Sequence, residues 1–218
     1  MYALAVFAPP SLERKLEASS ARVAVVGLGH VGLPLAHAFW RAGLQTIGFD
    51  SDPEKIAQLA CSESYIAGFA STDIEEMHKS GRFCATGNFT RLGDADAILV
   101  CVPTPVTAPG ERDLRHVIAA AGTIATHLKP QMLVVLQSTA DPRTVADIVL
   151  PILENRGLKA GRDFTLAFAQ QNPASGMDGS IPGIVGIDKH SGAIAETLYA
   201  RAFDTADHGT GRKEPVMA

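Results

Sequence analysis

The stretch from Arg22 to Asp50 constrains the fold of this chain more than any other. It begins with the β-branched run RVAVV, passes through three glycines spaced G-x-G-x-x-G, and continues with apolar residues at helical spacing. Ala42-Gly43 ends the helical pattern, and residues 44–49 return to a strand pattern that ends on Asp50. The order strand, glycine turn, helix, strand predicts a parallel βαβ unit.

Each glycine of this turn has its own physical role. Gly27 permits the sharp turn out of the strand, Gly29 leaves room for a pyrophosphate, and Gly32 lets the helix pack closely on the strand. The first N–H groups of the helix have no internal acceptors, and with the helix dipole they attract an anion. A structural turn that binds nothing is the alternative. The strand, helix and terminal acid in register favour a dinucleotide site.

Asp50 lies 18 residues after Gly32, where a carboxylate accepts hydrogen bonds from the adenosine ribose. That carboxylate would repel a 2′-phosphate, so the sequence favours NAD over NADP. Lys55 follows closely and would soften this preference.

Two further apolar runs predict central strands of a parallel sheet. Residues 97–102 and 132–137 are continuously apolar or nearly so, which is typical of strands buried on both faces. Strand and helix patterns alternate from residue 22 to about residue 187. This alternation predicts an α/β domain with a Rossmann-like, doubly wound, mainly parallel sheet and helices on both faces.

The predicted domain spans residues 21–203. Residues 1–20 are expected to be a leader that is disordered in part, and residues 204–218, which lack apolar periodicity, a frayed tail. Residues 88–95 read as a polar connection with little internal pattern.

Both apolar runs end in residues that suit a ligand site, because doubly wound sheets bind ligands outside the carboxyl ends of their strands. Pro103-Thr104-Pro105 stops the first run, which places Thr104 near the nicotinamide end of a bound cofactor. A loop that is merely rigid is the alternative. Ser138-Thr139 closes the second run. Their hydroxyls can bind a cofactor or a substrate alcohol, and a helix cap explains them equally well.

Composition narrows the range of partners and compartments. The net charge is −4 and no basic block stands out, so neither nucleic acid nor an acidic membrane surface is expected as a partner. No apolar run reaches transmembrane length. Cys61, Cys84 and Cys101 lack metal-ligand spacing. They are expected to be reduced, buried thiols of a cytoplasmic protein, and no metal site is predicted.

Taken together, these motifs resemble the N-terminal NAD-binding domain of the UDP-glucose/GDP-mannose dehydrogenases. Within that family the chain is most similar to bacterial UDP-N-acetylglucosamine or UDP-N-acetylmannosamine 6-dehydrogenases. The resemblance runs roughly from Arg22 to Phe203, and its segments include VAVVGLGHVGLPLAHAF, GFDSDPEKIAQL, SGRFCATGNFTRLGDADAILVCVPTPV, LVVLQSTADPRTV, GLKAGRDFTLAF and IPGIVGI.

The resemblance implies a role for each part of the motif set. Asp50 would hold the ribose, with Lys55 beside it, and Thr139 would be a catalytic candidate near the nicotinamide and the reacting carbon. The residues implied in wrapping the pyrophosphate are Gly27, Leu28, Gly29, His30, Val31 and Gly32. Those implied in bordering the rest of the cofactor are Val102, Pro103, Thr104, Pro105, Ser138 and Thr139.

The family reaction oxidises a sugar primary alcohol to a uronate in two hydride steps, through a thioester on a cysteine, for polysaccharide biosynthesis. The chain departs from the family pattern at Gln171, which stands where a glutamate is expected. A glutamine amide cannot cycle a proton near neutral pH. The family's central helical region and C-terminal sugar-nucleotide domain are expected to be absent after Phe203. A UDP-sugar would therefore bind only if that domain were supplied.

Three hypotheses remain at this point. The first is the NAD-binding domain of a nucleotide-sugar 6-dehydrogenase that lacks full turnover alone. The second is a truncated or degenerate module without catalysis, which binds NAD or pairs with a full-length homologue. The third is a dehydrogenase of the 3-hydroxyacid or 6-phosphogluconate type, whose N-terminal domain shares this topology although its loops fit VPTP and QST less well.

Overall fold

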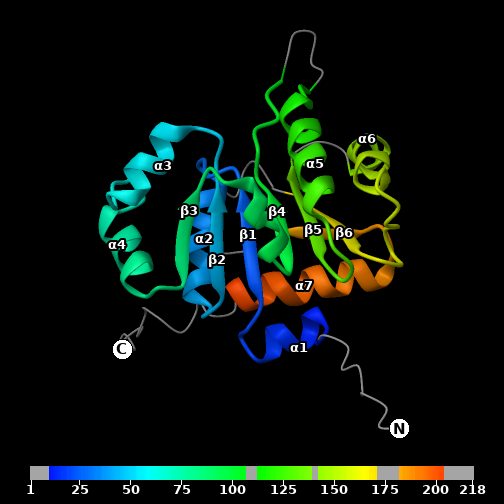
Figure 1. Ribbon diagram of the computed structural model, residues 1–218, viewed down its shortest axis with the longest axis horizontal. Coiled ribbons are helices and arrows are strands. Elements are labelled where there is room, and N and C mark those ends of the chain that lie inside the picture. The colour runs from blue at the N-terminus through cyan, green and yellow to red at the C-terminus, as the bar shows by residue number, and fades with distance from the viewer. Residues whose placement is uncertain (1–9, 107–111, 139–141, 171–181, 204–218) are drawn as a thin grey trace, which may run out of the picture.

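The computed structural model describes residues 10–106, 112–138, 142–170 and 182–203 (Figure 1). Its strands are β1 (Arg22–Val26), β2 (Gln45–Phe49), β3 (Phe83–Thr86), β4 (Ala97–Val100), β5 (Leu133–Ser138), β6 (Thr165–Gln170) and β7 (Gly183–Gly186). Its helices are α1 (Leu12–Glu17), α2 (Gly32–Arg41), α3 (Pro53–Ala60), α4 (Ser71–Lys79), the 3₁₀ helix η1 (Phe89–Asp94), α5 (Arg115–His127), α6 (Pro142–Glu154) and α7 (Lys189–Phe203).

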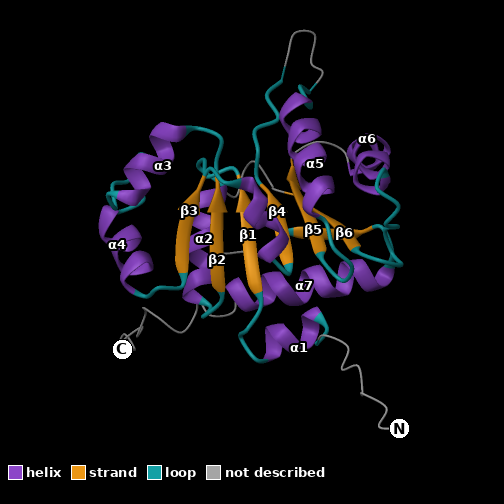
Figure 2. Cartoon of the chain, in the orientation of Figure 1, coloured by secondary structure: helices purple, strands orange, loops and turns teal. Residues whose placement is uncertain are grey.

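The strands form a seven-stranded sheet in the order β3-β2-β1-β4-β5-β6-β7. Strands β1 to β6 pair in parallel and β7 pairs antiparallel with β6. Figure 2 shows the strands side by side through the middle of the molecule, with helices around them. The order of the six parallel strands is that of a doubly wound sheet, with its reversal between β1 and β4. The predicted Rossmann-like fold is therefore confirmed.

The sheet separates two hydrophobic cores. In β1 the side chains of Val23 and Val25 enter the core shared with α1, α2 and α7, whereas Ala24 and Val26 enter the core shared with α5 and α6. Strands β4 and β5 alternate in the same way. Burial on both faces explains the unbroken apolar runs, because successive side chains of a strand point to opposite faces. No helix among residues 10–106, 112–138, 142–170 and 182–203 is long and apolar enough to cross a bilayer.

Part of the expected leader is folded, into a helix that the sequence analysis did not predict. Helix α1 buries Leu12 and Leu16, four residues apart, against the core that includes α7. The Lys15 ammonium lies 2.6 Å from Asp96 Oδ1 and so ties α1 to the residue before β4. The spacing of the two leucines was the available signal, since residues i and i+4 share one face of a helix.

Two other expectations need correction. Residues 88–95 contain the helix η1 rather than an irregular connection. It begins where the Asn88 side chain accepts the Thr90 N–H at 3.2 Å, and it buries Leu92. The thiols are not uniformly buried. Cys101 is buried, but Cys61 directly follows α3 and is exposed.

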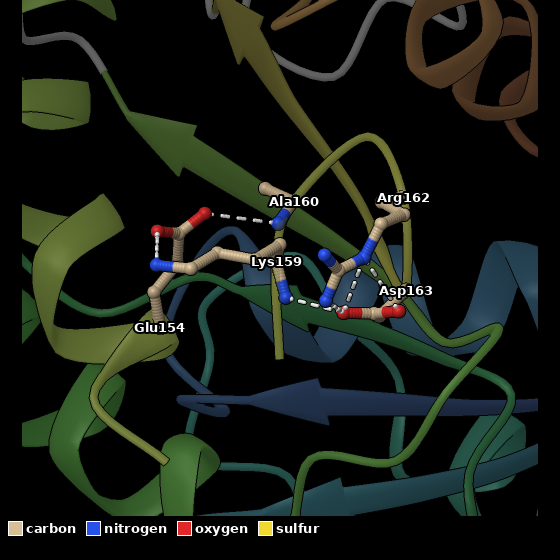
Figure 3. A network of polar contacts seen from close by, with 5 residues as sticks. All are labelled: Glu154, Lys159, Ala160, Arg162 and Asp163. Carbon is tan, nitrogen blue, oxygen red and sulfur yellow. Dashed lines mark hydrogen bonds and ion pairs between the residues drawn. The ribbon is translucent and has the colours of Figure 1, made fainter. Parts of the chain in front are cut away.

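The connection between α6 and β6 is held by a small polar network (Figure 3). Glu154 pairs with Lys159 at 2.7 Å and accepts the Ala160 N–H at 3.0 Å. Asp163 accepts the Lys159 N–H at 2.8 Å and pairs with Arg162 at 2.7 Å, and the Arg162 guanidinium lowers the pKa of the Asp163 carboxyl. This network precedes β6, so it lies at the amino edge of the sheet, opposite the strand ends where a ligand would bind.

Candidate functional site

A cavity of about 770 Å³ opens at the carboxyl ends of β1, β2, β4 and β5. It is lined by the glycine turn after β1, by residues 50–52 after β2, by residues 101–105 after β4, and by one face of α5. It therefore spans the reversal of strand order between β1 and β4, where doubly wound sheets bind ligands. Its volume is in the range of cavities that hold cofactors.

The three glycines of the turn have different surroundings. Gly27 has a φ of +91°, and a Cβ there would lie 2.8 Å from the Cys101 carbonyl oxygen. A Cβ on Gly32 would lie 1.7 Å from the Gly27 carbonyl oxygen. Both positions therefore require glycine for the fold itself. A Cβ on Gly29 would meet nothing within 4 Å, so at Gly29 the turn faces open space in the cavity.

The backbone N–H groups at the start of α2 are available to a ligand. The Leu33 N–H donates to the Gly29 carbonyl at 3.1 Å. The N–H groups of His30, Val31 and Gly32 have no acceptor within the described part of the chain. His30 and Val31 also line the cavity. Several free donors at the positive end of a helix dipole form an anion site.

Asp50 is the buried acid of the site, with 7% of its surface exposed. Its Oδ2 atom accepts the Leu28 N–H at 2.8 Å and lies 3.2 Å from the Lys55 ammonium. Its Oδ1 atom accepts the Asp52 N–H at 3.0 Å. Because each carboxylate oxygen has about two acceptor sites, Oδ1 keeps capacity for a ligand hydroxyl.

Tyr65 is a functional candidate that the sequence analysis missed. Its hydroxyl donates to the Leu28 carbonyl at 2.6 Å, and its ring centroid lies 6.0 Å from the Lys55 ammonium. Burial, and then the nearby Asp50 carboxylate, raise the pKa of the Tyr65 phenol, so it remains a donor. The two peptide groups that flank the Leu28 Cα are thus held, one at its N–H by Asp50 and the other at its carbonyl by Tyr65. Tyr65 lies in an irregular stretch, and local sequence offers no signal for this contact.

The loop after β4 and helix α5 form the other wall. The predicted residues Val102, Pro103, Thr104 and Pro105 all line the cavity, and the Arg112 guanidinium donates to the Thr104 carbonyl at 3.1 Å. Helix α5 adds four lining residues that the sequence analysis did not name. They are His116, Ala119, Ala120 and Thr123. Their spacing of three, four and seven residues marks one helix face and was the available signal.

The end of β5 contributes Gln137, which directly precedes the predicted Ser138. Gln137 lines the cavity, and its Oε1 atom accepts a hydrogen bond from the Tyr199 hydroxyl of α7. Ser138 is the last residue of β5 and is paired in register with Gln170. Thr139 and Gln171 lie outside the described residues.

Not every predicted binding residue lines the cavity. Leu28 is buried, with its side chain close to Gly48, and Gly32 packs against Gly27. Gly27, Gly29, His30, Val31, Asp50 and Lys55 do line it. The site thus brings together helix N–H donors, a buried carboxylate and a backbone left open at Gly29. This set fits a dinucleotide, which offers a diphosphate to the donors and a ribose hydroxyl to the acid.

Comparisons with known proteins show a family match over most of the chain. Residues 21–181 match the model of the UDP-glucose/GDP-mannose dehydrogenase family, NAD binding domain. A UDP-N-acetyl-D-glucosamine 6-dehydrogenase from Pseudomonas aeruginosa is 32% identical over 151 residues, which cover 69% of this chain and 35% of that protein.

Two solved structures are similar over most of the chain. The NDP-N-acetyl-D-galactosaminuronic acid dehydrogenase of Methanosarcina mazei Go1 superposes with a TM-score of 0.73 at 30% identity, covering 90% of this chain and 45% of that one. A ternary complex of GDP-mannose dehydrogenase from Pseudomonas aeruginosa gives a TM-score of 0.74 at 27% identity, covering 82% and 44%. The chain thus spans less than half the length of these relatives.

Proposed function

The chain belongs to the UDP-glucose/GDP-mannose dehydrogenase family and contains its NAD-binding domain, and from this premise we propose that it serves the oxidation of a nucleotide sugar to a uronate. NAD is the cofactor, and when bound it supplies the hydride acceptor. The residues of the chain bind and orient it.

The observation that carries the proposal is the anion site at the start of α2 beside the buried Asp50. The free N–H groups of His30 and Val31, which line the cavity, would hold the diphosphate. Asp50 Oδ1 would accept a hydroxyl of the adenosine ribose, while the other carboxylate oxygen stays engaged by Leu28 and Lys55. The nicotinamide half would then extend past residues 102–105 toward the carboxyl end of β5.

The substrate class is proposed from the relatives. The Pseudomonas aeruginosa relative acts, by its name, on UDP-N-acetyl-D-glucosamine, which supports a UDP-N-acetylhexosamine whose primary alcohol is oxidised for polysaccharide biosynthesis. The chain spans about a third of that relative, and we propose that a full-length homologue paired with this chain supplies the sugar site.

Gln171 supports a second proposal, an NAD-binding module without catalysis of its own. It stands at the family's glutamate position, and an amide cannot act as a proton-cycling base. The family match does not support the third hypothesis, a dehydrogenase of the 3-hydroxyacid or 6-phosphogluconate type.

Calorimetric titration with NAD and NADP tests the proposed binding. Wild type should bind NAD more tightly, Asp50→Asn should lose most of that preference, and Asp147→Ala, at an exposed position on α6, should bind like wild type. Equal wild-type affinity for both dinucleotides would contradict the ribose role of Asp50.

A second experiment tests turnover. The chain incubated with UDP-N-acetylhexosamines and NAD should produce no NADH. Production should appear when a full-length homologue inactivated at its own NAD site is added. Steady NADH formation by the chain alone would contradict the need for a partner.

A further inference from the structure

A buried polar pair lies at the wall of the cavity, and neither member was predicted as a site residue. Gln137 of β5 is 9% exposed, and Tyr199 of α7 is completely buried. The Tyr199 hydroxyl donates to Gln137 Oε1, which joins the helix to the sheet at the cavity wall.

The direction of this hydrogen bond fixes the orientation of the Gln137 amide. Burial raises the pKa of the Tyr199 phenol well above its usual value, so the hydroxyl keeps its proton. Within the described residues Gln137 is the partner found for that hydroxyl. A buried hydroxyl proton needs an acceptor, so Oε1 must face Tyr199 and the Nε2 amino group must face away.

Among the described residues, the amino group of Gln137 is therefore a donor without an acceptor. No acceptor for it is found in residues 10–106, 112–138, 142–170 and 182–203. Gln137 lines the cavity. A ligand that reaches this wall gains a hydrogen bond if it presents an acceptor oxygen there.

The order of the strands indicates which part of the dinucleotide lies next to Gln137. In the proposed complex the glycine turn after β1 binds the diphosphate, and Asp50 after β2 binds the adenosine ribose. Strand β5 lies two strands from β1, on the side of β1 opposite to β2. Two strand spacings are about 10 Å, a span that a ribose with its attached ring can cover. The nicotinamide half is the part that reaches Gln137, and its carboxamide carries an acceptor oxygen.

We propose that Gln137, held by Tyr199, donates its amide N–H to the carboxamide oxygen of the nicotinamide and so selects the complete dinucleotide over a fragment without the ring. This inference rests on the proposed NAD function and adds a specificity-determining residue to it. A ring held by its carboxamide cannot turn over about its bond to the ribose. One face of the ring would then always point away from the wall that Gln137 forms.

Titration of NAD and ADP-ribose against a matched set of variants tests this. The double variant Gln137→Leu/Tyr199→Phe removes both partners of the bond together, so no buried group is left unpaired. It should bind NAD about 5-fold more weakly, the effect of one hydrogen bond, while its affinity for ADP-ribose stays within about 2-fold of wild type. The single variant Tyr199→Phe frees the amide to rotate and should lose part of the NAD affinity only. Gln58→Ala, exposed on α3, should match wild type for both ligands.

The ratio of the two affinities separates the outcomes, because general damage to the fold would weaken both ligands alike. If the double variant loses NAD and ADP-ribose equally, or loses neither, the role of Gln137 is refuted while the proposed function stands. If wild type binds neither ligand, the proposed function fails, and this inference with it.

Discussion

Replacing Gly29 by alanine tests the dinucleotide site most directly, because the structure separates its effect on binding from its effect on folding. A Cβ at this position meets nothing within 4 Å, and the φ of Gly29 lies outside the region that strains other residues. Folding should therefore tolerate the change, and the stiffer unfolded chain should even stabilise the protein by about 0.4–1 kcal/mol.

Binding should respond in the opposite direction. The added methyl group would occupy open space on the cavity side of the turn, where the diphosphate is proposed to approach the N–H groups of His30 and Val31. Displacing the diphosphate from one hydrogen bond to a charged group costs about 1.5–3 kcal/mol. The Kd for NAD should therefore rise about 10- to 150-fold.

Calorimetric titration with NAD and a thermal unfolding curve on the same samples provide the assay. Gly122→Ala is the matched control, because Gly122 lies within α5, away from contacts, and does not line the cavity. It should raise the free energy of unfolding by about 1 kcal/mol and leave the Kd unchanged. Gly32→Ala is the opposite case, because its Cβ would lie 1.7 Å from the Gly27 carbonyl oxygen and should prevent folding.

One result would refute the reasoning. If Gly29→Ala folds with an unfolding midpoint at or above that of wild type and still binds NAD with the wild-type Kd, the diphosphate does not lie against this turn.

Three other changes have expected outcomes. Tyr65→Phe removes the donor to the Leu28 carbonyl. In a calorimetric titration it should weaken NAD binding about 2- to 10-fold, with little change in the unfolding midpoint. Unchanged NAD affinity would show that the contact only stabilises the fold. Leu16→Ala should lower the free energy of unfolding, measured in urea, by about 2–5 kcal/mol, because the Leu16 side chain is buried between α1 and the core. A loss under about 0.5 kcal/mol would show that α1 does not pack against this core. Burial raises the pKa of Cys101 from 9.0 to about 12, so the stability that its protonated thiol contributes is complete below pH 9 and is lost as pH rises toward 12. Urea titrations between pH 9 and pH 12 should show that the free energy of unfolding falls less steeply with pH in Cys101→Ala than in wild type. A thiol reagent should label the exposed Cys61 before the buried Cys101.

Much of the fold could be predicted from sequence because its signals are local. The apolar runs that became β4 and β5 are buried on both faces, and three glycines followed by a helix can pack in few ways. The sheet order then follows from general rules for such units. Helix α1 was missed because its two leucines gain their partners only when α7, far along the chain, folds against them.

In the candidate site, too, the residues with local signals could be predicted, and those that depend on distant partners could not. The sequence predicted the cavity-lining residues of the turn, the acid and the loop after β4, because ligands bind outside strand ends whatever the details of packing. Tyr65 and Gln137 were not found, because each acts through a partner 37 or 62 residues away. No spacing rule relates such positions, and only the assembled chain shows them together.

Helices α1 and α7 lie side by side (Figure 1), and the Arg201 guanidinium donates to the Ser19 hydroxyl at 2.6 Å. The first and the last described helices are therefore in contact with each other, and we call the α1–α7 contact the seam. A short linker could join them while the backbone is cut instead at the exposed bend near Arg156. Such a circular permutant should keep every wall of the cofactor cavity, because none of the walls crosses the seam.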